Sequence, residues 1–259
     1  MDHMVQLSPT PSGSGPTSNR GSGPASGLGP RGPVAALERR RLEAAPLITW
    51  YRGRDRVELS GRTVGSWVAK TVHLLTEEGI APGDRVGLPL LARHPLHWVS
   101  LTWLLSCWWA GVVPVVGRGP SDAPTDLDVS GPDPSGSDPR VPLVQCSLAP
   151  LGGACRNPAP GAIDFSDALA MPDEMPAPAC ARPTTARMEG TASLSEADLA
   201  AVLPIDRRML VATAPPPMDL ALLLTGCLTG SGSLILVDEM LDGSTPAALA
   251  DQEGAEIAS

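Results

Sequence analysis

The segment from His94 to Gly111, HPLHWVSLTWLLSCWWAG, most restricts the fold that this chain can adopt. Its length and apolar character predict a helix, with His94 as the N-cap residue and Pro95 at the first helical position. Because the helix is apolar on nearly every side, other elements are expected to cover it all round. At helical spacing, its tryptophans are expected to be core residues rather than the lining of a ligand pocket: Trp98, Trp103, Trp108 and Trp109.

The residues before this segment predict a helix, a hairpin and a second helix. Pro33 suits the first turn of a helix, and LITWY and RVELS (47–51 and 56–60) predict two strands joined by a short turn. In the second helix we expect Ser60 as the N-cap residue and Gly79 as the residue that ends it.

The rest of the chain alternates strands and helices with two irregular stretches. Strands are expected at 85–90, 112–117, 141–147, 208–214 and 233–237, and helices at 218–228 and 245–253. Residues 118–140 and 149–193 are rich in proline and glycine and are expected to be loops. Ser193 and Glu196 have the spacing of a capping box. The alternation predicts an α/β fold, a three-layer sandwich with a mainly parallel sheet.

The stretch GCLTGSGSLILVDE, residues 226–239, has the glycines and hydroxyls of a phosphate loop but the opposite order of elements. A phosphate loop follows a strand and opens a helix, whereas this stretch follows a helix and opens a strand. Gly230 and Gly232 are therefore expected to end a helix with a positive φ angle, where carbonyl oxygens would repel phosphate. No Gly-Lys-Ser/Thr follows, so we interpret the stretch as a turn.

Charge and cysteine content exclude several classes of protein. The net charge of −9 argues against nonspecific binding to nucleic acid or to an anionic membrane surface. The five cysteines are widely spaced and form no C-x-x-C pair, so neither a zinc site nor a disulfide framework is indicated. Cys107 and Cys227 lie in apolar stretches and are expected to be buried. No signal peptide or membrane-spanning run is present, and we expect a cytoplasmic protein.

The first residues differ in composition from the rest of the chain. Residues 1–33 are rich in serine, glycine and proline and predict a disordered N-terminal extension, followed by one domain at 34–259. A start codon assigned too far upstream would explain this composition equally well.

Isolated candidate side chains have ordinary structural explanations. His94 and His97 are three residues apart, but no third ligand accompanies them, so we expect a cap and a surface histidine rather than a metal site. Ser231 lacks the G-x-S-x-G pattern of a nucleophile elbow. The run ERRR at 38–41 is expected to be a solvated helix face, and the sequence gives no catalytic, cofactor-binding or metal-binding residue.

The stretch from 47 to 117 resembles the opening of adenylate-forming ligases, the acyl-CoA synthetase and luciferase-like superfamily. The matching residues are Gly79, Gly83, Asp84, Arg85, Val86, Pro89, Ala110, Gly111 and Pro114. A second stretch, from 206 to 257, resembles a later part of the N-terminal half of these enzymes. The chain is most similar to an uncharacterised actinobacterial group of truncated ligase-like proteins.

The residues on which adenylation depends in that family have no counterpart here. In place of its phosphate-gripping YTSGTTGxPK loop, the chain has PACARPTTARMEGTASLSEADL, where Thr184, Thr185 and Gly190 are a faint remnant. PPMD, residues 216–219, replaces the PLFH of the acyl pocket. The family's catalytic lysine acts as a pre-organised cation, and Lys70, the only lysine, is not expected to replace it because it lies within a helix, far from any matching motif. The family's later motifs would lie beyond the last residue.

Three hypotheses of function follow from this pattern. The chain is a non-catalytic ligase-like protein that binds a partner or a small acyl or adenine-type ligand, a residual enzyme with degenerate motifs, or an inactive remnant. We favour the first hypothesis. We expect no cofactor, and we expect the partner to be an unidentified small ligand, a second copy of the chain or another protein. Binding to nucleic acid or to a membrane is not expected.

Overall fold

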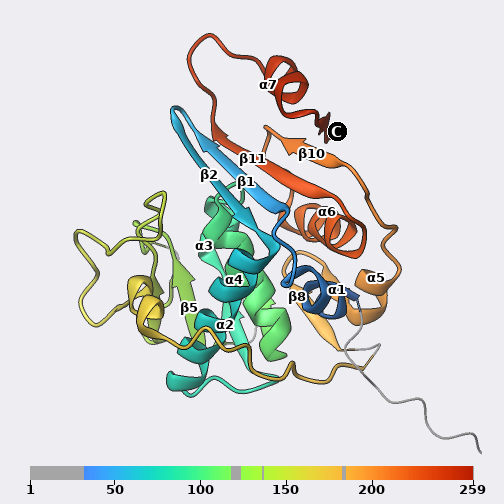
Figure 1. Ribbon diagram of the computed structural model, residues 1–259. Helices are drawn as coiled ribbons and strands as arrows, with labels where there is room; N and C mark the ends of the chain where they lie inside the picture. Colours follow the sequence, from blue (N-terminus) through green and yellow to red (C-terminus); the bar gives the residue numbers. More distant parts are fainter. Residues whose placement is uncertain (1–31, 118–123, 136, 183–184, 259) are drawn as a thin grey trace, which may run out of the picture.

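The computed structural model describes residues 32–117, 124–135, 137–182 and 185–258 (Figure 1). Most of the expected N-terminal extension therefore lies outside the described residues. Its last two residues, Gly32 and Pro33, already form the first turn of α1 (Gly32–Arg40), as expected for proline at a helix start.

One sheet contains five strands in the order β12-β10-β11-β1-β2. These strands are β1 (Pro46–Arg52), β2 (Asp55–Ser60), β10 (Arg208–Val211), β11 (Ser233–Glu239) and β12 (Glu256–Ile257). Only the β1–β2 pair is antiparallel, which confirms the expected hairpin. Along β1 and β11, alternate residues face the helices and the opposite side of the sheet.

The other sheet contains seven strands in the order β7-β6-β5-β3-β4-β8-β9, and only β8 and β9 pair antiparallel. These strands are β3 (Arg85–Gly87), β4 (Val113–Val115), β5 (Leu127–Ser130), β6 (Leu143–Gln145), β7 (Ile163–Asp164), β8 (Ala186–Glu189) and β9 (Ser193–Ser195). The α/β class with mainly parallel strands is confirmed, and the described strands form two sheets rather than one.

A layer of helices lies between the two sheets (Figure 1). This layer contains α1, α2 (Gly61–Glu77), α4 (Trp98–Ala110) and α6 (Pro217–Thr229). Shorter helices lie elsewhere: α3 (Pro89–Arg93), α5 (Glu196–Ala200), α7 (Pro246–Glu253) and a 3-10 helix at Phe165–Ala170. Helix α4 contacts β1 of one sheet and β4 of the other, so every residue from Trp98 to Trp109 is buried. The expected core role of its tryptophans is confirmed.

Several expected boundaries of helices and strands need correction. Helix α4 begins after His97, not His94, and the expected strand at 85–90 stops at Gly87 because Pro89 starts α3. The capping box consists of Ser195 and Asp198, not Ser193 and Glu196. Ser60 and Gly79 act as expected at the two ends of α2.

Both stretches expected to be loops contain strands. Strand β5 lies inside 118–140, and β7 and β8 lie inside 149–193. The proline, glycine and acidic residues of 118–140 indicate a loop, but the Asp128 carboxylate in β5 is buried and accepts hydrogen bonds from the Thr125 hydroxyl and the Asp138 N–H at 2.7 and 3.0 Å. A buried carboxylate with such partners is compatible with a central strand.

Candidate functional site

The glycine stretch at the end of α6 is a turn, as expected, but the reason given for its glycines is wrong. Neither Gly230 nor Gly232 has a positive φ angle. A Cβ atom on Gly230 would lie 2.3 Å from the carbonyl oxygen of Ile205, and one on Gly232 would lie 2.4 Å from the same oxygen. Close approach of another backbone segment, not φ, requires glycine at both positions.

Two arginines of α1 cover the carboxyl end of α6, which corrects the expectation of a solvated face at 38–41. Arg40 is 2% exposed, and its guanidinium donates hydrogen bonds to the carbonyls of Cys227, Gly230 and Gly232 at 2.8–3.0 Å. Arg39 donates to two further carbonyls of the last turn. Cations are favoured at this end of a helix dipole, so this end of α6 is closed by the protein itself.

The segment that the sequence resemblance led us to expect in place of a phosphate loop contains the β8–β9 hairpin, with a short turn through Gly190. A Cβ atom at Gly190 would lie 2.3 Å from the carbonyl oxygen of Val116, so the turn is packed against the end of β4. Behind the hairpin, the buried Arg187 guanidinium lies 2.5 Å from the Glu196 carboxylate and donates to the carbonyl of Trp108. Thr184 lies outside the described residues.

Lys70 has structural partners. Its ammonium group donates to the carbonyls of Leu169 and Met171 at 3.1 and 2.8 Å and lies 3.1 Å from the Asp173 carboxylate. It therefore holds the end of the 3-10 helix against α2.

The histidines do not form a metal site within the described residues, where no group of three or more potential ligands is found. Both ring nitrogens of His97 are used: Nδ1 accepts from the Val99 N–H, and Nε2 lies 3.2 Å from the carbonyl of Leu148. His97, expected to be the surface histidine, is buried and is the N-cap residue of α4. His94, expected to be the cap, is half-buried, and burial lowers its pKa. Ser231 donates its hydroxyl to Asp206 and has no histidine partner in the described chain. Cys107 and Cys227 are buried, as expected.

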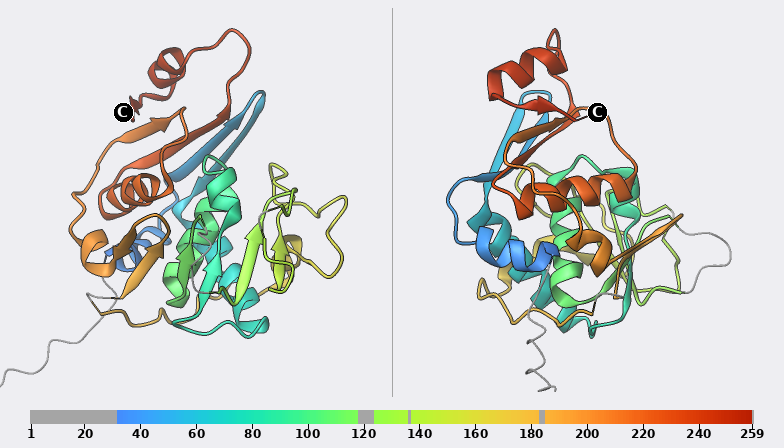
Figure 2. Two further views of the ribbon diagram at one scale, coloured as in Figure 1. Left: turned by 180° about the vertical axis from the view of Figure 1, so that it is seen from behind. Right: turned by 90° about the vertical axis from the view of Figure 1, so that its right-hand side faces the viewer.

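A cavity of about 730 Å³ lies on the face of the five-stranded sheet opposite α6, beneath α7. Figure 2 shows this sheet between α7 and α6. The walls come from the β1–β2 hairpin, from the end of β11 and from α7: Tyr51, Gly53, Arg54, Arg56, Val237, Glu239, Met240, Leu241, Ser244, Leu249, Gln252 and Glu253. This size and mixture of apolar and polar walls are typical of small-molecule sites.

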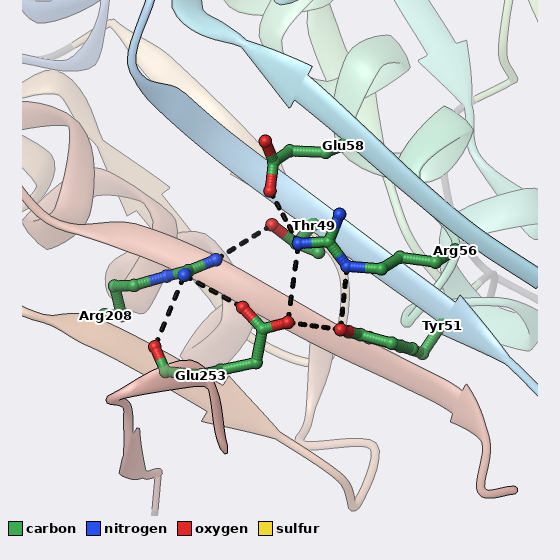
Figure 3. A network of polar contacts seen from close by, with 6 residues as sticks. All are labelled: Thr49, Tyr51, Arg56, Glu58, Arg208 and Glu253. Carbon is green, nitrogen blue, oxygen red and sulfur yellow. Dashed lines mark hydrogen bonds and ion pairs between the residues drawn. The ribbon is translucent and has the colours of Figure 1, made fainter. Parts of the chain in front are cut away.

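A network of polar side chains adjoins this cavity, and its members Tyr51, Arg56 and Glu253 line it (Figure 3). Glu253, at the end of α7, accepts a short hydrogen bond from the Tyr51 hydroxyl and lies 2.8 Å from Arg208. Arg56 donates from Nε to the Tyr51 oxygen and from Nη2 to Glu58, and it also faces Glu253 at 3.4 Å. Arg208 in turn donates to the Thr49 hydroxyl. The network thus fastens α7 to three strands.

Burial and neighbouring charges determine the protonation states of Tyr51 and Glu253 in the network. Burial and the hydrogen bond to Glu253 raise the pKa of Tyr51. Burial alone would raise the pKa of Glu253, but the Tyr51 hydroxyl and the charges of Arg208 and Arg56 outweigh it, so this pKa lies below its ordinary value. At neutral pH the site therefore holds a neutral phenol beside a paired carboxylate.

Sequence reasoning did not find this site. The alternation in β1 and β2 places Thr49, Tyr51, Arg56 and Glu58 on one face, and that pattern was an available signal. Glu253, however, is 202 residues from Tyr51 in the chain, and no local pattern brings them together.

The two-sheet fold with intervening helices defines the class of protein to which the chain is similar. An acyl-CoA synthetase from Brucella canis superposes with a TM-score of 0.65 and 17% identity over 90% of this chain and 48% of its own. Acetoacetyl-CoA synthetase from Streptomyces lividans has a TM-score of 0.62 and 16% identity over 86% of this chain and 41% of its own. The resemblance to adenylate-forming ligases is thereby confirmed at the level of the fold.

The chain spans about half the length of these solved structures. A protein of Mycobacterium tuberculosis strain H37Rv, described by family membership without a stated activity, is 28% identical over 212 residues, 74% of this chain and 82% of its own length. This relative fits the expected actinobacterial group. No protein-family model matches the chain. Among the described residues, no helix is long and apolar enough to cross a membrane.

Proposed function

We propose that this chain is a ligase-like protein that does not adenylate a carboxylic acid by itself and acts through binding. The proposal rests chiefly on the β8–β9 hairpin, which stands in place of the phosphate loop. Its turn at Gly190 is packed against Val116, and the chain's only lysine is engaged with Leu169, Met171 and Asp173. A loop that grips triphosphate needs free backbone N–H groups and a cation facing the anion.

The cavity beneath α7 is the ligand site in this proposal. Its polar network and its apolar wall of Val237, Met240, Leu241 and Leu249 give a small molecule both burial and hydrogen-bonding groups. The Glu253 carboxylate is stabilised by the Tyr51 hydroxyl and by Arg208 and Arg56, while burial and the hydrogen bond to Glu253 raise the pKa of the Tyr51 phenol. Neither group is poised to transfer a proton at neutral pH, which favours binding over catalysis.

A residual enzyme and an inactive remnant are the alternatives, and a thermal-shift screen separates them. Purified protein is heated with ATP, AMP, CoA, an acyl-adenylate analogue or small organic acids, because a ligand of the native state raises the melting temperature by mass action. A rise in melting temperature with organic acids, and none with ATP, supports the binding role. A rise with ATP and Mg²⁺ together with an acid supports the residual enzyme, and no rise with any compound supports the remnant.

A further inference from the structure

We infer that the cavity beneath α7 binds an amphipathic anion, a small molecule with an apolar body and one negatively charged group, and that Arg54 is the cation that recognises it. This inference rests on the proposed binding function and specifies its ligand class.

The apolar body is expected to lie against one wall of the cavity. Val237 and Leu249 belong to the small cluster that packs between the sheet and α7, and Met240 and Leu241 extend this surface toward solvent. Leu241 is 43% exposed, a large fraction for an apolar side chain beside a cavity. Covering it would stabilise a complex by removing apolar surface from water.

The charges of the other wall favour an anion. Glu253 is paired with Arg208 and Arg56, and Glu239 lies 3.6 Å from Arg52. Arg54, on the hairpin turn, is the one charged lining residue with no hydrogen bond or ion pair to any described residue.

Arg56, which lines the same cavity, offers a second donor. Its Nε and Nη2 atoms are occupied by Tyr51, Glu58 and Glu253, but no described residue hydrogen bonds to Nη1 (Figure 3). Two exposed guanidinium groups with free N–H donors, in a cavity that also has an apolar wall, suit a carboxylate, sulfonate or phosphate group. A cation at the same position would face two arginines and no unpaired carboxylate among the lining residues.

The dye 8-anilinonaphthalene-1-sulfonate tests this assignment because it is an amphipathic anion, and N-phenyl-1-naphthylamine has the same rings without the charge. Fluorescence titration of the full chain is expected to show saturable binding of the sulfonate at one site. Arg54→Gln should weaken that binding about fivefold, the loss of one partly exposed ionic contact, and should leave binding of the uncharged dye unchanged. Arg54→Lys should retain binding to within about twofold, because the charge remains.

Two matched variants control for general surface effects. Arg62 and Leu203 are exposed residues outside the cavity, so Arg62→Gln and Leu203→Ser should not change binding, whereas Leu241→Ser should weaken both dyes. The assignment is overturned if Arg54→Gln binds the sulfonate like the unchanged protein, if Arg62→Gln weakens it equally, or if binding does not saturate. Any of these results would refute the ligand assignment alone, because the absence of adenylation is tested separately by ATP–pyrophosphate exchange.

Discussion

The imidazole of His97 connects the start of α4 to the loop that follows β6. Its Nδ1 atom accepts from the Val99 N–H, so the proton of the neutral ring is on Nε2, which donates to the carbonyl of Leu148. The ring also meets Trp50 edge-on, with 4.7 Å between centroids. Burial lowers the pKa of His97 to about 3. The residue is thus a neutral helix cap inside the core.

This buried neutral histidine predicts that acid destabilises the protein. The unfolded chain takes up a proton on His97 near its ordinary pKa of 6.5, while the folded chain resists protonation down to about 3. The contribution of the neutral His97 ring to the stability of the folded protein is therefore present in full above pH 6.5. It is lost as the pH falls from 6.5 toward 3. Between pH 6.5 and 5 the free energy of unfolding should fall by about 2 kcal/mol in urea titrations. His97→Asn, which keeps a capping group, should flatten this decrease. The control is His73→Asn in α2, where the ring makes an exposed contact with the Glu174 carbonyl, and it should not flatten the decrease.

Gly230 gives a second prediction about a single residue. A methyl group there would meet the carbonyl oxygen of Ile205 at 2.3 Å, and because both partners belong to backbone, neither can move cheaply. Gly230→Ala should lower the free energy of unfolding by about 2 kcal/mol or more. Gly153→Ala is the control, since its nearest neighbour would be the Ala149 side chain at 3.8 Å. Equal stability of the two variants would contradict the account of this turn.

Among the elements, α1 and α6 depend on each other through the arginines of α1. Three carbonyls at the end of α6 have the Arg40 guanidinium as a donor, inside the protein. Arg40→Met should leave them without this donor and should cost about 2 to 4 kcal/mol of stability in chemical unfolding. Arg39→Met, at an exposed position, should cost less than about 1 kcal/mol. Similar small losses in both would mean that the Arg40 contacts do not stabilise α6.

Elements with a clear apolar period could be predicted from the sequence, and elements with buried polar residues could not. Helices α2 and α6 and the β1–β2 hairpin lie where their patterns place them. Strand β5 could not be predicted because it lies in a stretch rich in proline and glycine, and the hydrogen-bonding partners that allow Asp128 to be buried there come only with the fold. The run at 38–41 predicts a surface position for Arg40, because the sequence of α1 alone does not show the carbonyl partners that lie far away in the chain.

At the scale of the whole molecule, the apolar α4 was the informative signal. A helix with no polar face must be covered on both sides, and here the two sheets cover it. The division of the strands between two sheets, and the cavity beneath α7, depend on pairings between residues far apart in the chain. Local patterns do not contain such pairings, which is why the candidate site could not be predicted.

The central claim is that a ligase-like fold is present here without adenylation by this chain. ATP–pyrophosphate exchange measures that reaction directly, with acetate, octanoate and benzoate as acids and an active acyl-CoA synthetase as the positive control. Because the hairpin turn at Gly190 is packed against Val116 and Lys70 is engaged with other residues, we predict exchange no greater than in a reaction without protein. Exchange above that level, abolished by heating the sample and present in protein free of host ligases, would contradict the claim.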